Sequence, residues 1–326
     1  MAVVGAGHFG GYHVDKVANL PGVSLVAVVD RDANAAREQA GKYGARALLD
    51  YRELLGKVDA VNIAVPTVAH FEVARAFLGA GADVLVEKPM TLDEESARSL
   101  IDVAQANGRI LQVGHLERFS GVLEALRRHT VRPLYIDTIR ISPYKARSMD
   151  INVILDMMIH DLDLILFLVD APIVSVDAVG AAVFSDQEDI ASVRIKFENG
   201  CVANVVASRI SLKTERKMRI FEHDRYIAVD MDKHKINMVA RAAAGIPGGS
   251  TPVEFKEDSY DEGDALEREI SAFANSVRTR QPPTVSGEDG LKVLHAAMLI
   301  NESLRAHTAF LKQAAAAVPV RASAAS

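Results

Sequence analysis

A helical segment that carries four ionisable side chains in its middle is the first candidate for chemistry in this sequence. The stretch Ile151–Asp170, INVILDMMIHDLDLILFLVD, is apolar enough for a buried helix, yet it contains Asp156, His160, Asp161 and Asp163. Burying an unpaired charge is expensive, so these side chains need partners or a function. Because a helix places residues four apart on one face, we expect Asp156 and His160 side by side on a face turned to a cleft.

Other roles for this segment are open. A histidine in an apolar helix is usually a satisfied core residue, and Asp161 and Asp163 are typical of surface charges or interface partners as well as of direct catalysis. A zinc site from Asp156, His160 and Asp163 is the least favoured alternative, because no further cluster of ligands accompanies it. We therefore expect no metal.

A glycine-rich loop near the N-terminus predicts a dinucleotide cofactor. Its residues follow a short apolar strand and open a helix in the GxGxxG order Gly5, Ala6, Gly7, His8, Phe9, Gly10. In this context the glycines allow a tight turn and the close approach of a pyrophosphate, which binds at the N-terminus of the helix. The alternative is a glycine-rich turn without a ligand.

The residue that ends the second predicted strand helps to select the cofactor. Asp30 lies about twenty residues beyond the loop, where a carboxylate accepts both ribose hydroxyls of the adenosine. A 2′-phosphate would meet a like charge there, which favours NAD. Arg31 beside it can pair with that phosphate, so NADP stays the alternative.

The hydrophobic pattern predicts the elements that hold these residues. Up to residue 117, apolar β-branched runs alternate with amphipathic helical segments, which predicts a parallel sheet covered on both faces. The expected strands are Ala2–Val4, Val23–Val29, Ala45–Leu48, Val58–Val65, Val84–Glu87 and Ile110–Gly114. The expected helices are Phe9–Leu20, Asn34–Tyr43, His70–Gly79 and Asp93–Asn107, the last with a capping box of Thr91 and Glu94.

Longer strands follow one another in the second part of the chain, which predicts an α/β domain with an open, mainly antiparallel sheet. Its expected strands are Tyr135–Ile141, Ile173–Phe184, Ile190–Phe197, Val202–Ile210, Lys217–Phe221 and Tyr226–Asp230, with a two-residue hairpin turn at Asn199-Gly200. Its expected helices are Arg118–His129, the Ile151–Asp170 stretch, Asp264–Arg278 and Glu288–Ala306. The predicted division is a Rossmann domain over 1–117, a second α/β domain over 118–312 whose last helix packs back on the first, and a disordered tail over 313–326.

Composition excludes several classes of protein. The 326 residues include 37 Lys and Arg against 43 Asp and Glu, without the basic excess typical of binding to nucleic acids or anionic membranes. The first residues do not form a signal peptide, and the most apolar window, Ile151–Asp170, contains too many charges for a membrane span. A single cysteine, Cys201, cannot form an internal disulfide. We expect a cytoplasmic protein.

Two further segments complete a resemblance. They are Val65, Pro66, Thr67 and His70 after one predicted strand, and Glu87, Lys88 and Pro89 at the end of the next. With the glycine loop and the Asp156/His160 pair, they resemble the marks of the Gfo/Idh/MocA family of nicotinamide-dependent oxidoreductases: a GxGxxG loop, an EKP strand end and a DxxxH helix. The resemblance covers nearly the whole chain. It implies a Rossmann domain joined to an α/β domain whose open sheet forms homodimers or homotetramers.

The same resemblance implies roles for single residues. His160 would take a proton from a substrate hydroxyl as hydride leaves its carbon, with a pKa near the ordinary value of about 6.5. Lys88 would hydrogen-bond that oxygen and the nicotinamide ribose, while Asp156 would orient His160 or bind a neighbouring hydroxyl. The implied cofactor contacts are Gly5, Gly7, His8, Phe9, Gly10, Asp30, Arg31, Val65, Pro66, Thr67, His70, Glu87 and Lys88.

Several segments resemble the branch of the family that oxidises the 3-hydroxyl of UDP-N-acetylglucosamine. They are Gln112–Phe119, Arg147-Ser148, Leu155–Asp163, Gly200–Asn204 and Ala207–Arg209, although Ser120 stands where the branch usually has Asn. Arginine binds phosphate with two parallel hydrogen bonds, so Arg118 and Arg147 are the favoured contacts for a diphosphate, ahead of Arg140 and Lys145. His115 and Glu117 would touch the substrate or stabilise the domain junction.

Three other functions remain as alternatives. The first is a dehydrogenase of a free polyol, inositol or simple sugar, and the second is an NAD-dependent glycoside hydrolase of the same fold. The third is a regulator that senses the dinucleotide without catalysis. The presence of Lys88, Asp156 and His160 argues against this third function, and the chain carries no DNA-binding motif.

Overall fold

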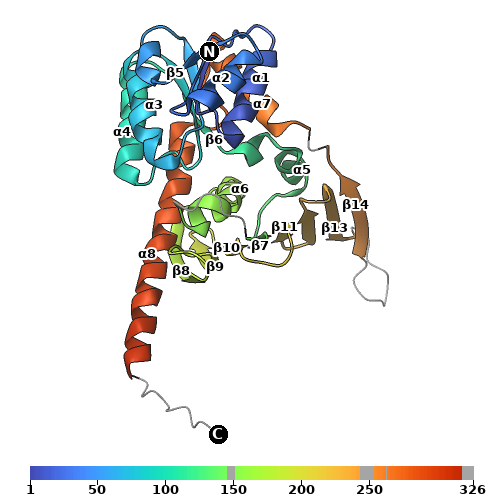
Figure 1. Ribbon diagram of the computed structural model, residues 1–326. Helices are drawn as coiled ribbons and strands as arrows, with labels where there is room; N and C mark the ends of the chain where they lie inside the picture. The colour runs from blue at the N-terminus through green and yellow to red at the C-terminus, as the bar shows by residue number, and fades with distance from the viewer. Residues whose placement is uncertain (145–150, 243–252, 262, 318–326) are drawn as a thin grey trace, which may run out of the picture.

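The structure, a computed structural model, describes residues 1–144, 151–242, 253–261 and 263–317 (Figure 1). Its first sheet has six parallel strands in the order β3-β2-β1-β4-β5-β6. The strands are β1 (Ala2–Val4), β2 (Ala27–Val29), β3 (Arg46–Leu48), β4 (Ala60–Ile63), β5 (Asp83–Glu87) and β6 (Leu111–Gly114). The order reverses between β1 and β4, and such a switch point opens a crevice at the carboxyl ends of the strands.

Helices cover both faces of this sheet. They are α1 (His8–Asn19), α2 (Ala33–Gly41), α3 (His70–Gly79) and α4 (Glu94–Ala106), with short 3-10 turns at Tyr51–Leu54, Thr67–Ala69 and Leu116–Phe119. Strands β1, β4 and β5 are buried along their whole length, as parallel strands between two helix layers must be. The predicted Rossmann architecture is therefore confirmed, although β2 is shorter than the predicted Val23–Val29.

The N-terminus of α4 differs from its predicted capping box. Asp93 is the N-cap, and its carboxylate accepts a hydrogen bond from the Ser96 backbone N–H at 2.8 Å. Thr91 lies too early to cap the helix, and its hydroxyl donates instead to the Asp93 carbonyl oxygen at 2.7 Å. The capping box of Thr91 with Glu94 was therefore wrong.

The second sheet has eight strands in the order β14-β13-β12-β11-β7-β10-β9-β8. These are β7 (Tyr135–Ile141), β8 (Ile173–Ala181), β9 (Ile190–Phe197), β10 (Val202–Ser208), β11 (Glu215–Phe221), β12 (Arg225–Asp230), β13 (Lys235–Arg241) and β14 (Val253–Ser259). All neighbouring pairs are antiparallel except β7 with β10, which confirms the predicted sheet type. The sequence analysis missed β13 and β14; the exposed edge strand β14, VEFKEDS, lacks an apolar face.

The turn between β9 and β10 is longer than predicted. The Phe197 N–H donates to the Cys201 carbonyl at 2.9 Å, which leaves three residues, 198–200, in the loop. Gly200 has φ +86°, a left-handed conformation that glycine adopts without strain. The hairpin is thus confirmed, but its turn is a three-residue one with glycine in the left-handed position.

The remaining helices link the two sheets. They are α5 (Gly121–His129), a π-helical segment (Ile154–Met158) that runs into α6 (Ile159–Val169), α7 (Ala265–Thr279) and α8 (Gly287–Ala317). In Figure 1, α5 and α6 lie between the two sheets, and α8 passes from α4 along β8.

The predicted tail is corrected in part, since α8 continues to Ala317; residues 318–326 lie outside the described part of the chain. The division between 117 and 118 stays a prediction.

Two contacts fix α7 and α8 against the first domain. Leu266, Ile270 and Phe273 of α7 pack with Val14 and Val17 of α1 in one apolar cluster. On α8, His295 Nδ1 lies 2.7 Å from Glu94 Oε1 of α4. After the second sheet the chain therefore returns to its N-terminal domain.

No helix in the described ranges is both long and apolar enough to cross a membrane.

A carboxyl group is buried where α7 meets the first sheet. Glu269 is fully buried, and within the described part of the chain neither of its carboxyl oxygens has a hydrogen-bond partner. Burial raises the pKa of Glu269 well above its ordinary value, and the nearby Glu87 carboxylate raises it further. The fold therefore favours the protonated form of Glu269.

This protonation makes stability depend on pH. The unfolded chain releases the Glu269 proton above about pH 4.3, whereas the folded chain keeps it to a higher pH, so folding becomes less favourable as pH rises from that value toward the raised pKa of the folded state. We expect Glu269→Gln, which mimics the neutral acid, to melt at a higher temperature than wild type at pH 8 and at nearly the same temperature at pH 4.5. Glu267→Gln, on the exposed side of α7, is the control without this pH dependence. A less stable Glu269→Gln variant at pH 8 would contradict the protonated state.

Candidate active site

The glycine loop lies at the switch point of the first sheet. Gly5 follows β1 with φ +102°, and a Cβ there would come within 2.3 Å of the Ala64 carbonyl oxygen at the end of β4. A Cβ on Gly10 would lie 2.1 Å from the Gly5 carbonyl oxygen. The turn and its packing against the helix therefore require glycine at both positions.

The N-terminus of α1 is open to an anion. Gly7 is its N-cap and makes no side-chain cap, and a Cβ at Gly7 would meet nothing within 4 Å. The first amide N–H groups of a helix lack intrahelical partners and carry the positive end of the helix dipole. Gly7, His8 and Phe9 are exposed at this end. These residues fit the pyrophosphate of a dinucleotide.

Asp30 fixes the loop and faces the same crevice. Its Oδ2 accepts from the Ala6 N–H at 2.6 Å and its Oδ1 from the Asp32 N–H at 2.8 Å. Each carboxylate oxygen has two acceptor positions, so both can still accept a ribose hydroxyl. Arg31 is exposed beside it. The arrangement supports the predicted cofactor contacts of Asp30 and Arg31, which remain proposals.

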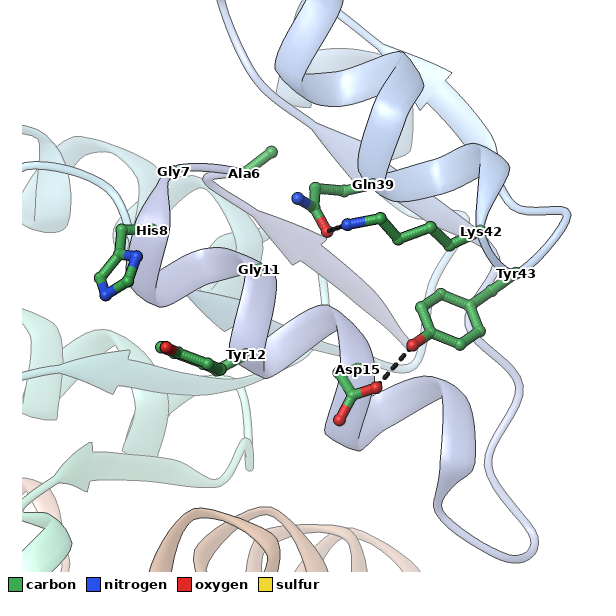
Figure 2. Close-up of a pocket in the computed structure, with 9 residues that line it drawn as sticks. All are labelled: Ala6, Gly7, His8, Gly11, Tyr12, Asp15, Gln39, Lys42 and Tyr43. Atoms are coloured by element: carbon green, nitrogen blue, oxygen red, sulfur yellow. Dashed lines mark hydrogen bonds between the residues drawn. The ribbon is translucent and has the colours of Figure 1, made fainter.

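A groove of about 430 Å³ runs beside the loop along α1 and α2 (Figure 2). The Tyr43 hydroxyl, two residues after α2, donates across it to Asp15 of α1 at 2.5 Å, whereas the 3.0 Å bond from Lys42 to Gln39 stays at the C-terminal end of α2. Ala6, Gly7 and His8 line its end. The groove thus exposes the start of α1 to solvent, while the contact of Tyr43 with Asp15 ties the end of α2 to α1.

His70 joins two segments of the crevice. Its Nδ1 lies 2.8 Å from the Pro89 carbonyl oxygen and its Nε2 lies 2.9 Å from the Val65 carbonyl oxygen. Burial lowers the pKa of His70, although both carbonyls favour the protonated ring. Because both nitrogens contact the backbone, the structure gives His70 a positioning role, and its cofactor contact stays a prediction. It ties the Val65, Pro66, Thr67 segment to the end of β5.

Glu87 is held from behind by a histidine that the sequence analysis missed. His13 Nε2 on α1 lies 3.0 Å from Glu87 Oε1, and the Asn62 side-chain nitrogen on β4 lies 3.3 Å from His13 Nδ1. If the Asn62 amide donates to Nδ1, the ring proton is on Nε2 and points at the carboxylate. Glu87 thus fixes the strand end before Lys88, and its predicted cofactor contact remains untested.

Lys88 reaches across to the helix of the second domain. Its Nζ donates to the Asp156 backbone carbonyl at 2.7 Å. Asp156 belongs to the π-helical segment Ile154–Met158, which corrects the expectation of one regular α-helix from Ile151. π-Helical turns widen the helix and occur frequently at functional sites. The contact brings Lys88, Asp156 and the following turn with His160 to one place.

His160 is neutral at physiological pH. Burial lowers the pKa of His160 well below its ordinary value, and the positive charges of Lys88 and Arg140 lower it further. Its Nδ1 is buried and has no hydrogen-bond partner among the described residues. The expectation of a pKa near 6.5 was therefore wrong. A neutral imidazole is the form that accepts a proton.

Buried ion pairs neutralise the other two acids of the helix. Asp161 receives two hydrogen bonds from Arg140, at 2.9 and 3.0 Å, and Arg140 also contacts Glu117 at 3.1 Å. The two carboxylate oxygens of Asp163 accept hydrogen bonds from Arg118 Nε, at 2.9 and 2.8 Å. These four partners are almost completely enclosed. Asp161 and Asp163 are therefore structural ion-pair partners.

The ion pairs change the expected phosphate contacts. Arg118 gives its Nε to Asp163 and lies over the Phe167 ring at 4.3 Å, which argues against the predicted diphosphate contact. The same holds for Arg140. His115 is buried, and burial lowers its pKa, which favours the expected role at the domain junction over the expected substrate contact. Lys145 and Arg147 lie outside the described residues.

Comparison with known proteins agrees with this geometry. Residues 1–115 match the family described as an oxidoreductase family with an NAD-binding Rossmann fold, and residues 132–227 match the GFO/IDH/MocA C-terminal domain. Over 305 residues the chain is 39% identical to UDP-N-acetylglucosamine 3-dehydrogenase of Acidithiobacillus ferrooxidans, covering 93% of this chain and 96% of that protein. A solved structure of that enzyme superposes with a TM-score of 0.87 over 94% of this chain and 97% of that chain. Inositol 2-dehydrogenase of Rhizobium meliloti is 27% identical over 313 residues, which is 90% of this chain and 92% of that protein.

The glycine loop allows stability to be separated from cofactor binding. We expect Gly10→Ala to lower the free energy of unfolding by about 1–3 kcal/mol, because its Cβ collides with backbone. Gly7→Ala is expected to keep wild-type stability but to weaken NAD binding by about tenfold or more, because its Cβ lies where the pyrophosphate approaches. Thermal melting and NAD titration check the two effects. Unchanged NAD affinity in Gly7→Ala would place the pyrophosphate elsewhere.

Proposed function

The chain belongs to the Gfo/Idh/MocA family of NAD-dependent oxidoreductases, and from this premise we propose that it oxidises the 3-hydroxyl of UDP-N-acetylglucosamine to a 3-keto sugar nucleotide. The observation that carries the proposal is the contact between Lys88 Nζ and the Asp156 carbonyl, which brings the end of β5 to the helix with His160. The relative that acts on this sugar nucleotide is similar along nearly the whole chain.

The residues of the site have complementary parts in this reaction. Bound NAD supplies the nicotinamide carbon that accepts a hydride from the sugar. Neutral His160 accepts the hydroxyl proton at a ring nitrogen, so that oxygen charge does not build up as the hydride leaves. The Lys88 ammonium has three N–H donors, so it can keep its bond to the Asp156 carbonyl and still donate to the substrate oxygen. The Asp156 carboxylate orients His160 or accepts from a neighbouring sugar hydroxyl.

A dehydrogenase of an inositol or other polyol is the second candidate. Its support is the similarity to inositol 2-dehydrogenases, at lower identity than the sugar-nucleotide relative. Both candidates use the same Lys88 and His160 chemistry, and they differ in whether the nucleotide is needed. Association into homodimers or homotetramers through the second sheet and a cytoplasmic location also remain proposals. The exposed Phe221 and Phe255 on the second sheet support the association.

The first test compares substrates. We expect NADH formation from NAD with UDP-N-acetylglucosamine and little with free N-acetylglucosamine or inositol, with a transaminase added to remove the keto product. His160→Ala should lower kcat by about 100-fold or more, because the proton acceptor is lost. His223→Ala, which removes an exposed histidine between β11 and β12, is the matched control with unchanged kcat. Equal or better turnover of inositol would instead favour the second candidate.

The pH dependence tests the state of His160. Because His160 must be neutral to accept a proton and its pKa lies below the ordinary value, initial rates of kcat/KM should stay level as pH falls through 6.5 and decline only at lower pH. Rates measured with saturating NAD from pH 5 to 8 give this profile. A decline centred at or above pH 6.5 would contradict the neutral, depressed histidine.

A further inference from the structure

The second sheet presents a second arginine to the face that carries α6. Arg216 on β11 is the direct antiparallel partner of Arg140 on β7. Side chains of directly opposed residues project from the same face of a sheet. Arg140 reaches Asp161 of α6, so this face is the one that α6 covers. Arg216 therefore points to the helix side of the sheet.

The neighbours of Arg216 along β11 agree with this direction. Met218 and Ile220, two and four residues further on, are completely buried on the same face. Arg216 lies at the end of this row, at the margin of the face that α6 covers, and its side chain is 52% exposed. The intervening Lys217 projects from the opposite face. The register thus places a partly exposed arginine at the margin of the α6 layer.

The two arginines differ in their partners. Arg140 is enclosed by Asp161 and Glu117 at hydrogen-bond distances. In the described part of the chain, the one carboxylate within ion-pair distance of the Arg216 side chain is Asp232, whose Oδ1 lies 3.9 Å from Nε. That separation is too long for a hydrogen bond. Arg216 is therefore a cation whose fork of donors is available to a ligand.

Arg216 is also close enough to the site to affect it. Its positive charge is one of those that lower the pKa of His160, together with Lys88 and Arg140. The charge of Arg140 is balanced by the carboxylates of Asp161 and Glu117, whereas among the described residues Arg216 has only the 3.9 Å contact with Asp232. The side of the site next to His160 thus carries a positive field, which favours a negatively charged ligand.

We propose that Arg216 binds the negatively charged group of the substrate, which, resting on the proposed function, is the diphosphate of the sugar nucleotide. The planar guanidinium matches two phosphate oxygens with parallel hydrogen bonds, and the loose contact with Asp232 costs little to open. The sequence analysis assigned the diphosphate contact to Arg118, whose Nε instead donates to Asp163. The inference assigns this contact to Arg216. It is a specificity residue, because the reacting hydroxyl is handled by Lys88 and His160.

Substrates with and without the charged group test the proposal. Arg216→Gln should raise KM for UDP-N-acetylglucosamine by about 10- to 100-fold, the loss of a hydrogen bond to a charged group, and change kcat by less than about threefold. Turnover of inositol, however slow, should be unchanged. Arg216→Lys should recover part of the loss, because it keeps the charge but not the fork. Lys217→Gln, one residue away on the opposite face, is the matched control and should behave as wild type.

Direct binding separates this inference from the proposed function. The probe is UDP, titrated by calorimetry into the wild-type and Arg216→Gln proteins saturated with NADH. We expect UDP to bind wild type and to bind Arg216→Gln at least tenfold more weakly, with a smaller salt dependence. If wild type does not oxidise UDP-N-acetylglucosamine, the proposed function fails, while a tenfold loss of UDP affinity still supports Arg216 as the anion contact. Equal UDP affinity in the two proteins, no binding to wild type, or the same loss in Lys217→Gln overturns the inference.

Discussion

Two buried ion pairs let an apolar helix carry an active site. The segment from Ile154 to Val169 holds three acids and a histidine, and it is packed between the two sheets. Arg140 neutralises Asp161, and Arg118 neutralises Asp163, each with hydrogen bonds that satisfy the carboxylate. Removing one partner of such a pair would leave an uncompensated buried charge, which is strongly destabilising. The pairs therefore fix the helix and leave Asp156 and His160 for the site.

Ionic contacts also link the two domains. Arg140 on β7 of the second sheet contacts Glu117, in the turn that follows the first sheet, at 3.1 Å. The contact of Lys88 with the Asp156 carbonyl makes a second link across the same boundary. His70 and His13 hold the strand ends on the other side. The relative position of Lys88 and His160 thus depends on contacts that lie outside the reacting atoms.

Patterns that repeat along the chain were predictable, whereas partners across it were not. The parallel sheet and the glycine loop follow from local periodicity and motif order. No local pattern shows that Arg118 meets Asp163 or that His13 meets Glu87, because these pairs are 45 and 74 residues apart in the chain. The charged edge strand β14 was missed because it is exposed and lacks an apolar face, and the π-helical turn was missed because no local pattern distinguishes it from a regular α-helix. Arg216 could be placed only once the register of β7 and β11 was known.

The most direct measurement of the central claim follows the hydrogen itself. UDP-N-acetylglucosamine carrying deuterium at carbon 3 is incubated with the protein and NAD, and the reduced cofactor is analysed by mass spectrometry. If Lys88 and His160 act on the 3-hydroxyl, the NADH gains one mass unit and the rate shows a primary isotope effect. NADH formed without deuterium would mean that another carbon is oxidised, and it would contradict the assignment of the reaction.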